Sequence, residues 1–464
     1  MSPIKIEPQN HPASFRDPSG YIFESEGVLY RNINAICADD YNFLLSSGLA
    51  QTLFANYSLV PHDEVEFIQQ NNSNSYKVIQ PQRLPLISYP YEWCFGQLKD
   101  AALLTLNVLK VALDHGMILK DASAFNVQFR NGGNPIFIDT LSFTIYKEGQ
   151  TWAGYKQFCE HFLAPLSLGS FLGVEYLSLW KSSLDGVSLP MASQLLPWYT
   201  NLLPSTFMHI HLHSKTVEFY SSKRKPQTEK EGKISKRNLV AMVDQLSSFV
   251  TGLNINKKTK TQWQDYDKET HYSEKSRNNK ATLVKELVAQ VAPRAVWDIG
   301  ANDGFFSRLI ADERRHVLSL DIDPLAVEKN YGYVKEINSN VYPLIFALTN
   351  PTPSIGWANK EREKLTNRSK PDLIMALALI HHIVITHNVP FIEVAKYFSS
   401  IAEWLIIEFV PADDDKILSL PNTAGKRTYN RENFDRGLLH YYKLIADHKI
   451  EGSDRRLLLL RKTV

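Results

Sequence analysis

The sequence predicts an α/β protein of more than one domain, with a doubly wound, mainly parallel sheet near the C-terminus and an α+β domain before it. Three observations support this prediction. A chain of 464 residues is too long for a single hydrophobic core. Between residues 281 and 331, short apolar runs alternate with helical periods, which is typical of parallel strands joined by helices. The N-terminal half instead shows hairpin turns and a long amphipathic helix.

The composition is that of a folded, soluble protein and argues against several classes. The formal net charge of +2, with 44% hydrophobic and 22% charged residues, disfavours a dedicated nucleic-acid binder. Apolar runs such as 372–385 are too short or too polar to span a bilayer. The first residues lack an apolar signal sequence, and three widely spaced cysteines form no disulfide framework. We therefore expect a cytoplasmic protein.

One change in composition divides the chain. Residues 221–237 carry seven Lys/Arg and two Glu, which favours a solvated connector over a phosphate- or polysaccharide-binding patch. An amphipathic helix candidate follows at 238–253. We predict an N-terminal domain at 1–220, a basic connector and helix at 221–264, and a C-terminal domain at 265–464.

The most informative motif is the glycine turn after the strand predicted at 295–300. Residues Asp298 to Gly304 form the pattern D-x-G-x-x-x-G. Gly300 can turn the chain sharply and lets the backbone approach a ligand, and a helix from Phe305 would present free N–H groups. Asp321 ends the next predicted strand, where a carboxylate can accept hydrogen bonds from ribose hydroxyls. Together they predict a nucleoside site at this edge of the sheet.

The turn resembles motif I of class I S-adenosylmethionine-dependent methyltransferases, and the resemblance covers about residues 265–464. It implies a Rossmann-like methyltransferase sheet, with further strands at 371–383 and 403–411 and a closing hairpin at 442–462. The cofactor that it implies is S-adenosylmethionine, bound by Tyr272, Asp298, Gly300, Ala301, Asn302, Gly304, Asp321 and Ile322. The alternative is an unrelated nucleotide-binding α/β domain. The sequence departs from the family after the third strand, where Ala347 or Leu348 stands in place of an acid, so adenine recognition falls to Asn350 or backbone groups.

Methyl transfer depends on positioning and, for a hydroxyl or amine acceptor, on a base. The catalytic candidates are His381 and His382, because histidine titrates near neutral pH, and Glu408. Non-catalytic histidines and a solvated loop at Glu408 are the alternatives. Lys280, like Tyr272, is expected to cover the cofactor. The run 209–213, HIHLH, lacks further ligands at metal spacing and predicts buried imidazoles on a helix or strand.

The N-terminal half holds a second set of candidates. Asp121, Asn126 and Asp139 follow a long helix predicted at 96–116 and a hinge near 89–93. This order resembles the protein-kinase-like fold and its aminoglycoside-phosphotransferase relatives. The resemblance implies that Asp121 orients a hydroxyl nucleophile, while Asn126 and Asp139 hold Mg²⁺ with ATP.

Two parts of the kinase pattern are missing. The candidate nucleotide loop at 20–27 lacks the glycine-rich pattern, and Arg31 is the only cation near the place of the strand lysine, to which it is not equivalent. Coincidental spacing, a kinase-like fold without phosphoryl transfer, and an active kinase all remain open.

The whole chain also resembles bacterial nodulation-associated, methyltransferase-like proteins. We predict S-adenosylmethionine-dependent methyl transfer to an unidentified small-molecule or glycan acceptor, with the N-terminal domain assisting acceptor binding. The alternatives are a bifunctional kinase-methyltransferase acting on a saccharide or glycan, and a non-enzymatic scaffold with decayed nucleotide sites. We expect no nucleic-acid partner and no membrane span. The oligomeric state is not predicted.

Overall fold

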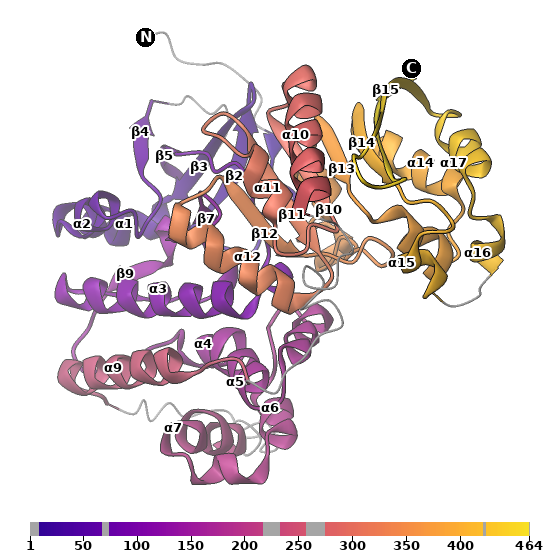
Figure 1. The fold of residues 1–464 in the computed structure, drawn as a ribbon. Coiled ribbons are helices and arrows are strands. Elements are labelled where there is room, and N and C mark those ends of the chain that lie inside the picture. Colours follow the sequence, from indigo (N-terminus) through magenta and orange to yellow (C-terminus); the bar gives the residue numbers. More distant parts are fainter. Residues whose placement is uncertain (1–8, 67–73, 217–232, 257–273, 421–423, 464) are drawn as a thin grey trace. The chain divides into compact units, whose positions relative to one another are not determined.

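The chain divides into two units, which are described separately. The computed structural model describes residues 9–66, 74–216, 233–256, 274–420 and 424–463 (Figure 1). Unit 1 comprises Met1–Arg130, Asn134–Thr259 and Ser354–Glu363, and unit 2 comprises Asn131–Gly133, Lys260–Pro353 and Lys364–Val464. The predicted domain boundaries at 220 and 264 lie outside the described residues, so they stay predictions.

Unit 1 begins with a five-stranded antiparallel sheet in the order β1-β2-β3-β5-β4. Its strands are β1 (Gln9–Asn10), β2 (Gly20–Ser25), β3 (Val28–Asn34), β4 (His62–Val65) and β5 (Ser75–Pro81). The hairpin predicted around residues 25–27 is confirmed, with Glu26 and Gly27 at positive φ, as a two-residue turn requires. Because the short β1 precedes β2, residues 11–19 connect the first two strands. The stretch 20–27, the candidate nucleotide loop, comprises β2 and the turn of this hairpin, and its role in nucleotide binding stays a prediction.

The hydrophobic period of residues 38–56 predicts one amphipathic helix, but the structure has two helices there, α1 (Ala38–Ser46) and α2 (Leu49–Ala55). Gly48 lies between them with φ of 77°, a left-handed conformation that interrupts a helix and favours glycine. The hydrophobic period continues across this break, which is why the sequence alone suggested one helix.

The long helix predicted next is confirmed as α3 (Phe95–Asp114), followed by Gly116 at φ of 77°. Two small antiparallel pairs come after it: β6 (Met117–Leu119) with β9 (Phe143–Ile145), and β7 (Val127–Arg130) with β8 (Asn134–Phe137). Short helical turns η2 (Pro90–Glu92), η3 (Ala124–Asn126) and η4 (Thr140–Ser142) flank them.

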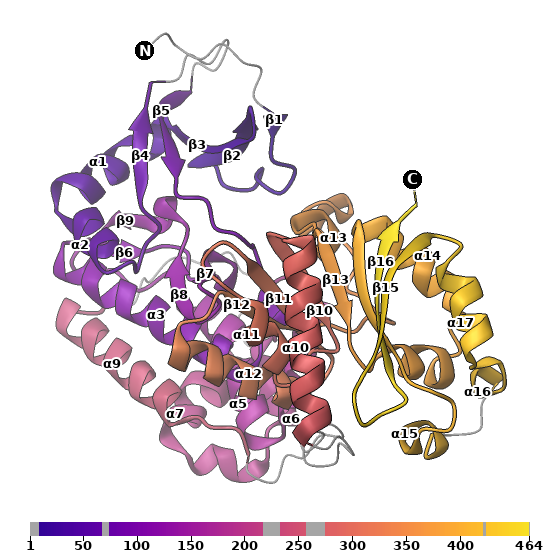
Figure 2. The ribbon, with the colours of Figure 1, turned by 45° about the horizontal axis from the view of Figure 1, so that its top comes forward.

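Helices complete unit 1 (Figure 2). They are α4 (Tyr155–Phe158), η5 (Cys159–Leu163), α5 (Ala164–Phe171), η6 (Val174–Ser182), α6 (Leu189–Leu195), η7 (Trp198–Leu202), α7 (Pro204–Thr206), η8 (Phe207–Leu212) and α9 (Lys236–Gly252). The segment Ser354–Glu363, with its turn η9 (Trp357–Asn359), also belongs to this unit. Arg16 donates to the buried carboxylate of Glu361, with Nη2 to Oε2 at 2.9 Å. Tyr89 Oη accepts from the Glu363 amide at 3.2 Å.

Unit 2 is built on a seven-stranded sheet in the order β12-β11-β10-β13-β14-β16-β15. Its strands are β10 (Ala295–Ile299), β11 (His316–Asp321), β12 (Val341–Ile345), β13 (Leu373–Ala376), β14 (Trp404–Phe409), β15 (Tyr442–Lys449) and β16 (Arg456–Lys462). The first five are parallel, and β16 pairs antiparallel with β14 and β15. The predicted α/β sheet and its closing hairpin are therefore confirmed.

Helices cover both faces of this sheet. The core on one face joins α10 (Glu274–Val291), α11 (Phe305–Ile310) and α12 (Pro324–Ile337) to alternate strand residues such as Val296 and Ile406. Phe409 has the opposite parity on β14 and packs against Phe434 with ring centroids 4.8 Å apart. Phe434 belongs to α17 (Arg431–Leu438), which packs on α14 (Phe391–Ile401).

The shorter helices of unit 2 are α13 (Leu365–Arg368), η10 (His382–Thr386), α15 (Asp415–Leu418) and α16 (Ala424–Thr428). No described helix in either unit combines the length and apolar character needed to cross a bilayer.

Candidate active site

The predicted glycine turn lies at the carboxyl end of β10. Gly300, Asn302 and Gly304 all have positive φ, at 75°, 50° and 73°. The amides of Gly300 and Ala301 both donate to the carbonyl of Leu320 on the neighbouring β11, at 2.8 and 3.1 Å. The turn is thereby fixed to the end of the second strand, where it places its backbone at the edge of the sheet.

The two glycines of the motif do different things. A Cβ on Gly300 would lie 3.0 Å from Leu379 Cδ1, in the loop after β13. A Cβ on Gly304 would lie 2.2 Å from the side-chain amide of Asn330 on α12. Gly304 therefore permits close packing between the turn and α12, and the first amide of α11, on Phe305, is capped by Asp303 Oδ1 at 3.3 Å. This differs from the sequence expectation of free N–H groups there.

Asp321 ends β11 beside the turn. Its Oδ2 accepts from the amide of Asn302 at 2.7 Å, and its Oδ1 accepts from the amide of Asp323 at 2.9 Å. Two carboxylate oxygens offer about four acceptor sites, so the Asp321 carboxylate keeps acceptor capacity for a ligand. Burial raises the pKa of Asp321 to about 6. Ile322, the next residue, is 55% exposed.

Asp298 faces the opposite direction, into a buried polar cluster. Ser307 Oγ donates to Asp298 Oδ2 at 2.6 Å and lies 2.9 Å from Ser319 Oγ. Asn330 Nδ2 donates to Ser319 Oγ at 2.8 Å, and Arg308 Nη1 donates to Asn330 Oδ1 at 2.7 Å. Burial raises the pKa of Asp298 to about 6. Asp298 thus joins β10 to α11, and its carboxylate is engaged by protein groups.

The sequence analysis did not identify this polar cluster. Ser307, Ser319 and Asn330 are isolated small polar residues in apolar elements, which single-sequence patterns treat as neutral. The usable signal is that Asn330 falls among the inward positions of α12, beside Val327 and Tyr331, which are all buried. A buried amide at such a position indicates a hydrogen-bonded partner on the sheet.

Glu408 lies at the end of β14 and is fully buried. Its Oε2 is 2.6 Å from Lys280 Nζ on α10, and its Oε1 is 3.5 Å from Arg455 Nη1. Arg455 also binds Asp414 through Nε and Nη2, at 2.7 and 3.0 Å. The structure therefore places Glu408 and Lys280 in one buried ion-pair network, an arrangement that holds α10 to the sheet. Their predicted roles at the cofactor and acceptor stay predictions.

His381 and His382 follow β13, with ring centroids 4.1 Å apart. His381 is 1% exposed, and neither ring nitrogen has a hydrogen-bond partner among the described residues. Burial, followed by the neighbouring His382, holds the pKa of His381 well below its usual range. Burial likewise lowers the pKa of His382 to about 4. Both imidazoles are therefore neutral at pH 7, and the two ring nitrogens of His381 are buried without a hydrogen-bond partner among the described residues.

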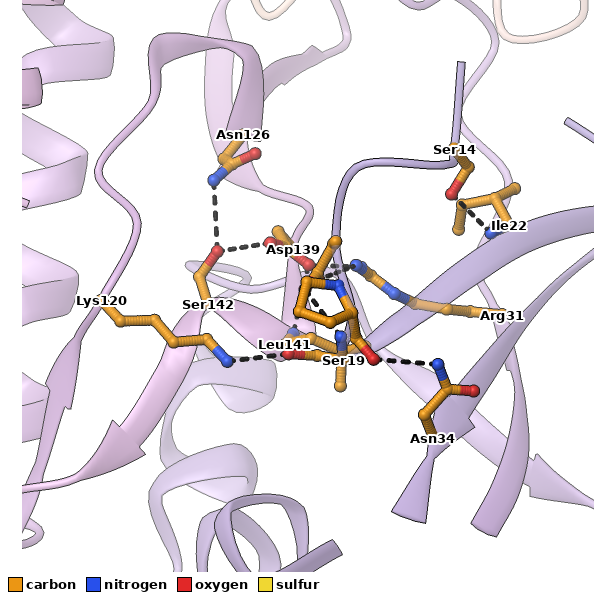
Figure 3. Close-up of polar contacts among 12 residues, drawn as sticks. Ser14, Ser19, Ile22, Arg31, Asn34, Lys120, Asn126, Asp139, Leu141 and Ser142 are labelled. Atoms are coloured by element: carbon orange, nitrogen blue, oxygen red, sulfur yellow. Dashed lines mark hydrogen bonds and ion pairs between the residues drawn. The ribbon is translucent and has the colours of Figure 1, made fainter. Parts of the chain in front are cut away.

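Two of the three N-terminal candidates, Asn126 and Asp139, meet in unit 1 (Figure 3). Ser142 Oγ donates to Asp139 Oδ2 and accepts from Asn126 Nδ2, the latter at 3.2 Å. Arg31 reaches across from β3 and forms an ion pair with Asp139 Oδ1, which also accepts from the Leu141 amide at 3.1 Å. Arg31 and Asp139 are mostly buried, with 12% and 14% of their side chains exposed.

Asp121 borders this group, and its carboxylate is hydrogen-bonded by the Asn126 side chain. Its Oδ1 accepts from the Ser123 amide at 2.9 Å, and burial, followed by the charge of Asp139, raises the pKa of Asp121. Lys120 Nζ donates to Ser19 Oγ at 2.9 Å, and Ser19 ends the β1–β2 connection. A Cβ on Gly20 would lie 2.7 Å from Leu141 Cδ1. The start of β2 therefore packs directly on the residues that follow Asp139.

The structure brings together Asp298, Gly300, Ala301, Asn302, Gly304, Asp321 and Ile322 at one edge of the unit 2 sheet. It brings Asn126 and Asp139 together in unit 1. Tyr272 lies outside the described residues. Among those residues, no group of three or more His, Cys, Asp or Glu side chains has the arrangement of a metal site.

The strand order of unit 2, its glycine turn and the carboxylate at the end of β11 correspond to the arrangement of the class I S-adenosylmethionine-dependent methyltransferase fold. The chain is 35% identical over 456 residues to nodulation protein NoeA of Rhizobium meliloti (strain 1021), covering 96% of this chain and 94% of that protein. The chain belongs to the NoeA family. No family model matches it.

Solved structures resemble parts of the chain. The N-methyltransferase NodS from Bradyrhizobium japonicum WM9 is 12% identical, with a TM-score of 0.32, over 41% of this chain and 99% of NodS. WbdD, crystallised with the kinase inhibitor LY294002, is 16% identical, with a TM-score of 0.29, over 43% of each chain. Matches of this size establish neither the activity nor the ligands of this chain.

Proposed function

We propose that unit 2 binds S-adenosylmethionine at the glycine turn and that the protein transfers a methyl group to a hydroxyl or amine of a small-molecule or glycan acceptor. The observation that carries this proposal is the Asp321 carboxylate. Two backbone amides orient it at the end of β11, and the carboxylate keeps acceptor capacity for a ribose hydroxyl.

The residues around Asp321 fit such a cofactor. Gly300, Ala301 and Asn302 bring backbone to the same edge without large side chains, and the exposed Ile322 offers an apolar surface to an adenine ring. Asp298 contributes by holding the turn to α11. No acid follows β12 within the next five residues, so Asn350 or backbone groups are left to recognise the adenine amino group.

The acceptor side is assigned to the loop after β13. S-adenosylmethionine, when bound, supplies an electrophilic methyl group. The neutral imidazole of His381 can accept the proton that an acceptor hydroxyl or amine loses, or can hold that group in line. Its two nitrogens without protein hydrogen-bond partners support this role over that of Glu408, which is engaged by Lys280 and Arg455.

For unit 1 we propose a kinase-like fold that assists acceptor binding without phosphoryl transfer. The order of hairpin, helices, hinge, long helix and loop with Asp121, Asn126 and Asp139 supports the fold. The Arg31–Asp139 ion pair argues against catalysis, because Asp139 would have to bind Mg²⁺ and its carboxylate is already neutralised by a guanidinium.

Isothermal titration of the full chain with S-adenosylmethionine tests the cofactor site. We expect saturable binding that weakens at least tenfold in Asp321→Ala, since two hydrogen bonds to a charged group are lost. The matched control is Asp454→Ala. Asp454 is an exposed carboxylate that pairs with Lys449 and is remote in sequence from the turn, so this variant should bind as wild type. Absence of binding by the wild-type chain would overturn the proposal.

A further inference from the structure

Unit 1 has an exposed apolar surface that the proposed methyl transfer does not explain. Residues 189–214 contain no Asp, Glu, Lys or Arg, yet they form the short helices α6, η7, α7 and η8. Large apolar side chains point to solvent along them: Met191, Leu195, Trp198, Leu202, Met208 and Leu212 are each at least 41% exposed, and Trp198 and Leu202 reach 76% and 72%. We call α6, η7 and η8 the apolar platform.

The apolar platform is held together by buried hydrogen bonds. His211 is 2% exposed; its Nδ1 lies 2.8 Å from Ser193 Oγ on α6, and its Nε2 lies 2.9 Å from Thr200 Oγ1 on η7. Tyr155 Oη lies 2.7 Å from His209 Nδ1 and fixes η8 to α4. Two of the three imidazoles of HIHLH, those of His209 and His211, are thus buried on a helix as the sequence predicted, and that of His213 is half-buried. Because these bonds fix the helices, the exposed side chains belong to an ordered surface.

The chemistry of the platform indicates what covers it. Monomeric proteins rarely expose apolar patches of this kind without a binding role. Trp198 and Tyr199, which is 43% exposed, are the residue types that favour the boundary between lipid headgroups and hydrocarbon. The sequence that follows is basic: Lys215 is exposed, and residues 221–237 carry seven Lys/Arg and two Glu. An uncharged apolar surface that is followed in the sequence by a basic stretch complements an anionic lipid surface.

We propose that the apolar platform docks onto a lipid bilayer that contains anionic lipids. The helices lie in the interface without spanning it, with Trp198 and Leu202 entering the headgroup–acyl boundary. An anionic bilayer can engage both the apolar side chains of the platform and the basic sequence that follows them in the chain. The inference is independent of the cofactor site, because it concerns residues in unit 1 alone.

The test is co-sedimentation of the full chain with vesicles. Three preparations are compared: vesicles with 30% phosphatidylglycerol in phosphatidylcholine, pure phosphatidylcholine vesicles, and no vesicles. The double variant Trp198→Ser/Leu202→Ser removes the two most exposed apolar side chains of the platform. The matched control is Trp357→Ser/Ile36→Ser, which removes a tryptophan and an aliphatic side chain of similar exposure, 71% and 77%, from other surfaces of unit 1.

We expect the wild type and the control to bind the anionic vesicles and to be released by 0.5 M NaCl. The platform variant should bind at least tenfold more weakly, since two large apolar side chains no longer leave water. Equal binding to neutral vesicles, or equal binding by the platform variant, would overturn the proposal. So would a dimer, by sedimentation velocity, that the platform variant converts to a monomer, since a second copy would then cover the surface.

Discussion

At the scale of single residues, burial sets the protonation of the site. Asp298 and Asp321 both have pKa values raised to about 6 by burial, against an ordinary value of 3.8. A raised carboxyl pKa means that the folded state disfavours the charged form. Below pH 3.8 both carboxyl groups are protonated in the folded and unfolded states, so they do not change the free energy of unfolding. As the pH rises from 3.8 to about 6, they lower the free energy of unfolding progressively. At neutral pH both carboxylates are charged although burial disfavours the charged form, which is common in binding sites.

Cofactor affinity is expected to fall on acidification. Protonation of Asp321 replaces an acceptor by a donor, so a ribose hydroxyl loses a partner. With a pKa of about 6, the ionised fraction falls about tenfold between pH 7 and pH 5, and affinity for S-adenosylmethionine should fall by a similar factor. Calorimetric titration at several pH values measures this.

Two variants separate the carboxylates in that experiment. Asp321→Asn should bind more weakly and show little pH dependence, whereas Asp298→Asn should retain the wild-type slope because its carboxylate contacts Ser307. An unchanged slope in Asp321→Asn would assign the titration to another group.

Replacing His381 by leucine is expected to stabilise the protein. Two buried ring nitrogens without partners cost folding free energy, and an apolar side chain of similar size removes that cost, so the free energy of unfolding should rise by about 1 kcal/mol. Urea denaturation measures it.

His211→Leu is the matched control. His211 is as buried as His381, but both of its ring nitrogens are hydrogen-bonded, so the same change should destabilise the protein by about 1–3 kcal/mol. If the two variants lose stability equally, His381 is a structural residue and not a ligand-binding one.

From residue types and spacing we could predict at which strand ends the candidate residues lie. We could not predict which side chains they contact. The positions of Asp298, Gly300 and Asp321 at strand ends followed from the motif. The pairing of Glu408 with Lys280, 128 residues earlier in the chain by number, and of Arg31 with Asp139, depends on tertiary contacts that carry no local pattern.

At the scale of elements, the turn between β10 and α11 depends on glycine at its end. Gly304→Ala places a Cβ at φ of 73° and within 2.2 Å of Asn330. Left-handed strain and overpacking together should cost about 2–5 kcal/mol of unfolding free energy. The measurement is a urea or thermal unfolding curve.

Gly332→Ala is the matched control and is expected to raise the free energy of unfolding. Gly332 lies within α12, exposed, and a Cβ there meets nothing within 4 Å. Alanine in a helix interior is favoured over glycine, so this variant should gain about 0.5–1 kcal/mol. A gain of stability in Gly304→Ala equal to that of Gly332→Ala would show that the turn tolerates a side chain.

Elements with a strong period were predictable, and short ones were not. The helix α3 and the hairpin β15–β16 stand out because their patterns run for many residues. The two-residue β1 has no detectable period, and the break at Gly48 interrupts a hydrophobic pattern that itself continues. Both misreadings concern backbone geometry that apolar periodicity does not record.

At the scale of the whole molecule, one chain combines the mainly parallel sheet of unit 2 with the antiparallel sheet and helices of unit 1. The sequence predicted two different domains because glycine turns and carboxylates at strand ends have recognisable spacings. It could not predict that unit 1 would fill its own candidate site. There Arg31 neutralises Asp139, Lys120 binds Ser19, and Gly20 packs on Leu141.

Unit 1 is therefore expected to ignore Mg-ATP. Binding would require breaking the Arg31–Asp139 ion pair and moving the β1–β2 connection, so the melting temperature of the wild-type chain should be unchanged by Mg-ATP at concentrations where a ligand would raise it by mass action. S-adenosylmethionine is the positive control in the same assay. A rise with Mg-ATP that Asp139→Ala abolishes would establish a working nucleotide site.

The segment Ser354–Glu363 has a consequence for how the protein can be taken apart. It lies between β12 and β13 in sequence but packs with unit 1, where Arg16 engages the buried Glu361. A fragment that ends before residue 265 would contain Arg16 but lack Glu361. A fragment that starts at residue 265 would contain Glu361 but lack Arg16. Cutting the chain once therefore cannot give two fragments that each contain a complete unit. Two co-expressed fragments could restore the protein only if the segment Ser354–Glu363 of one fragment packed into unit 1 of the other.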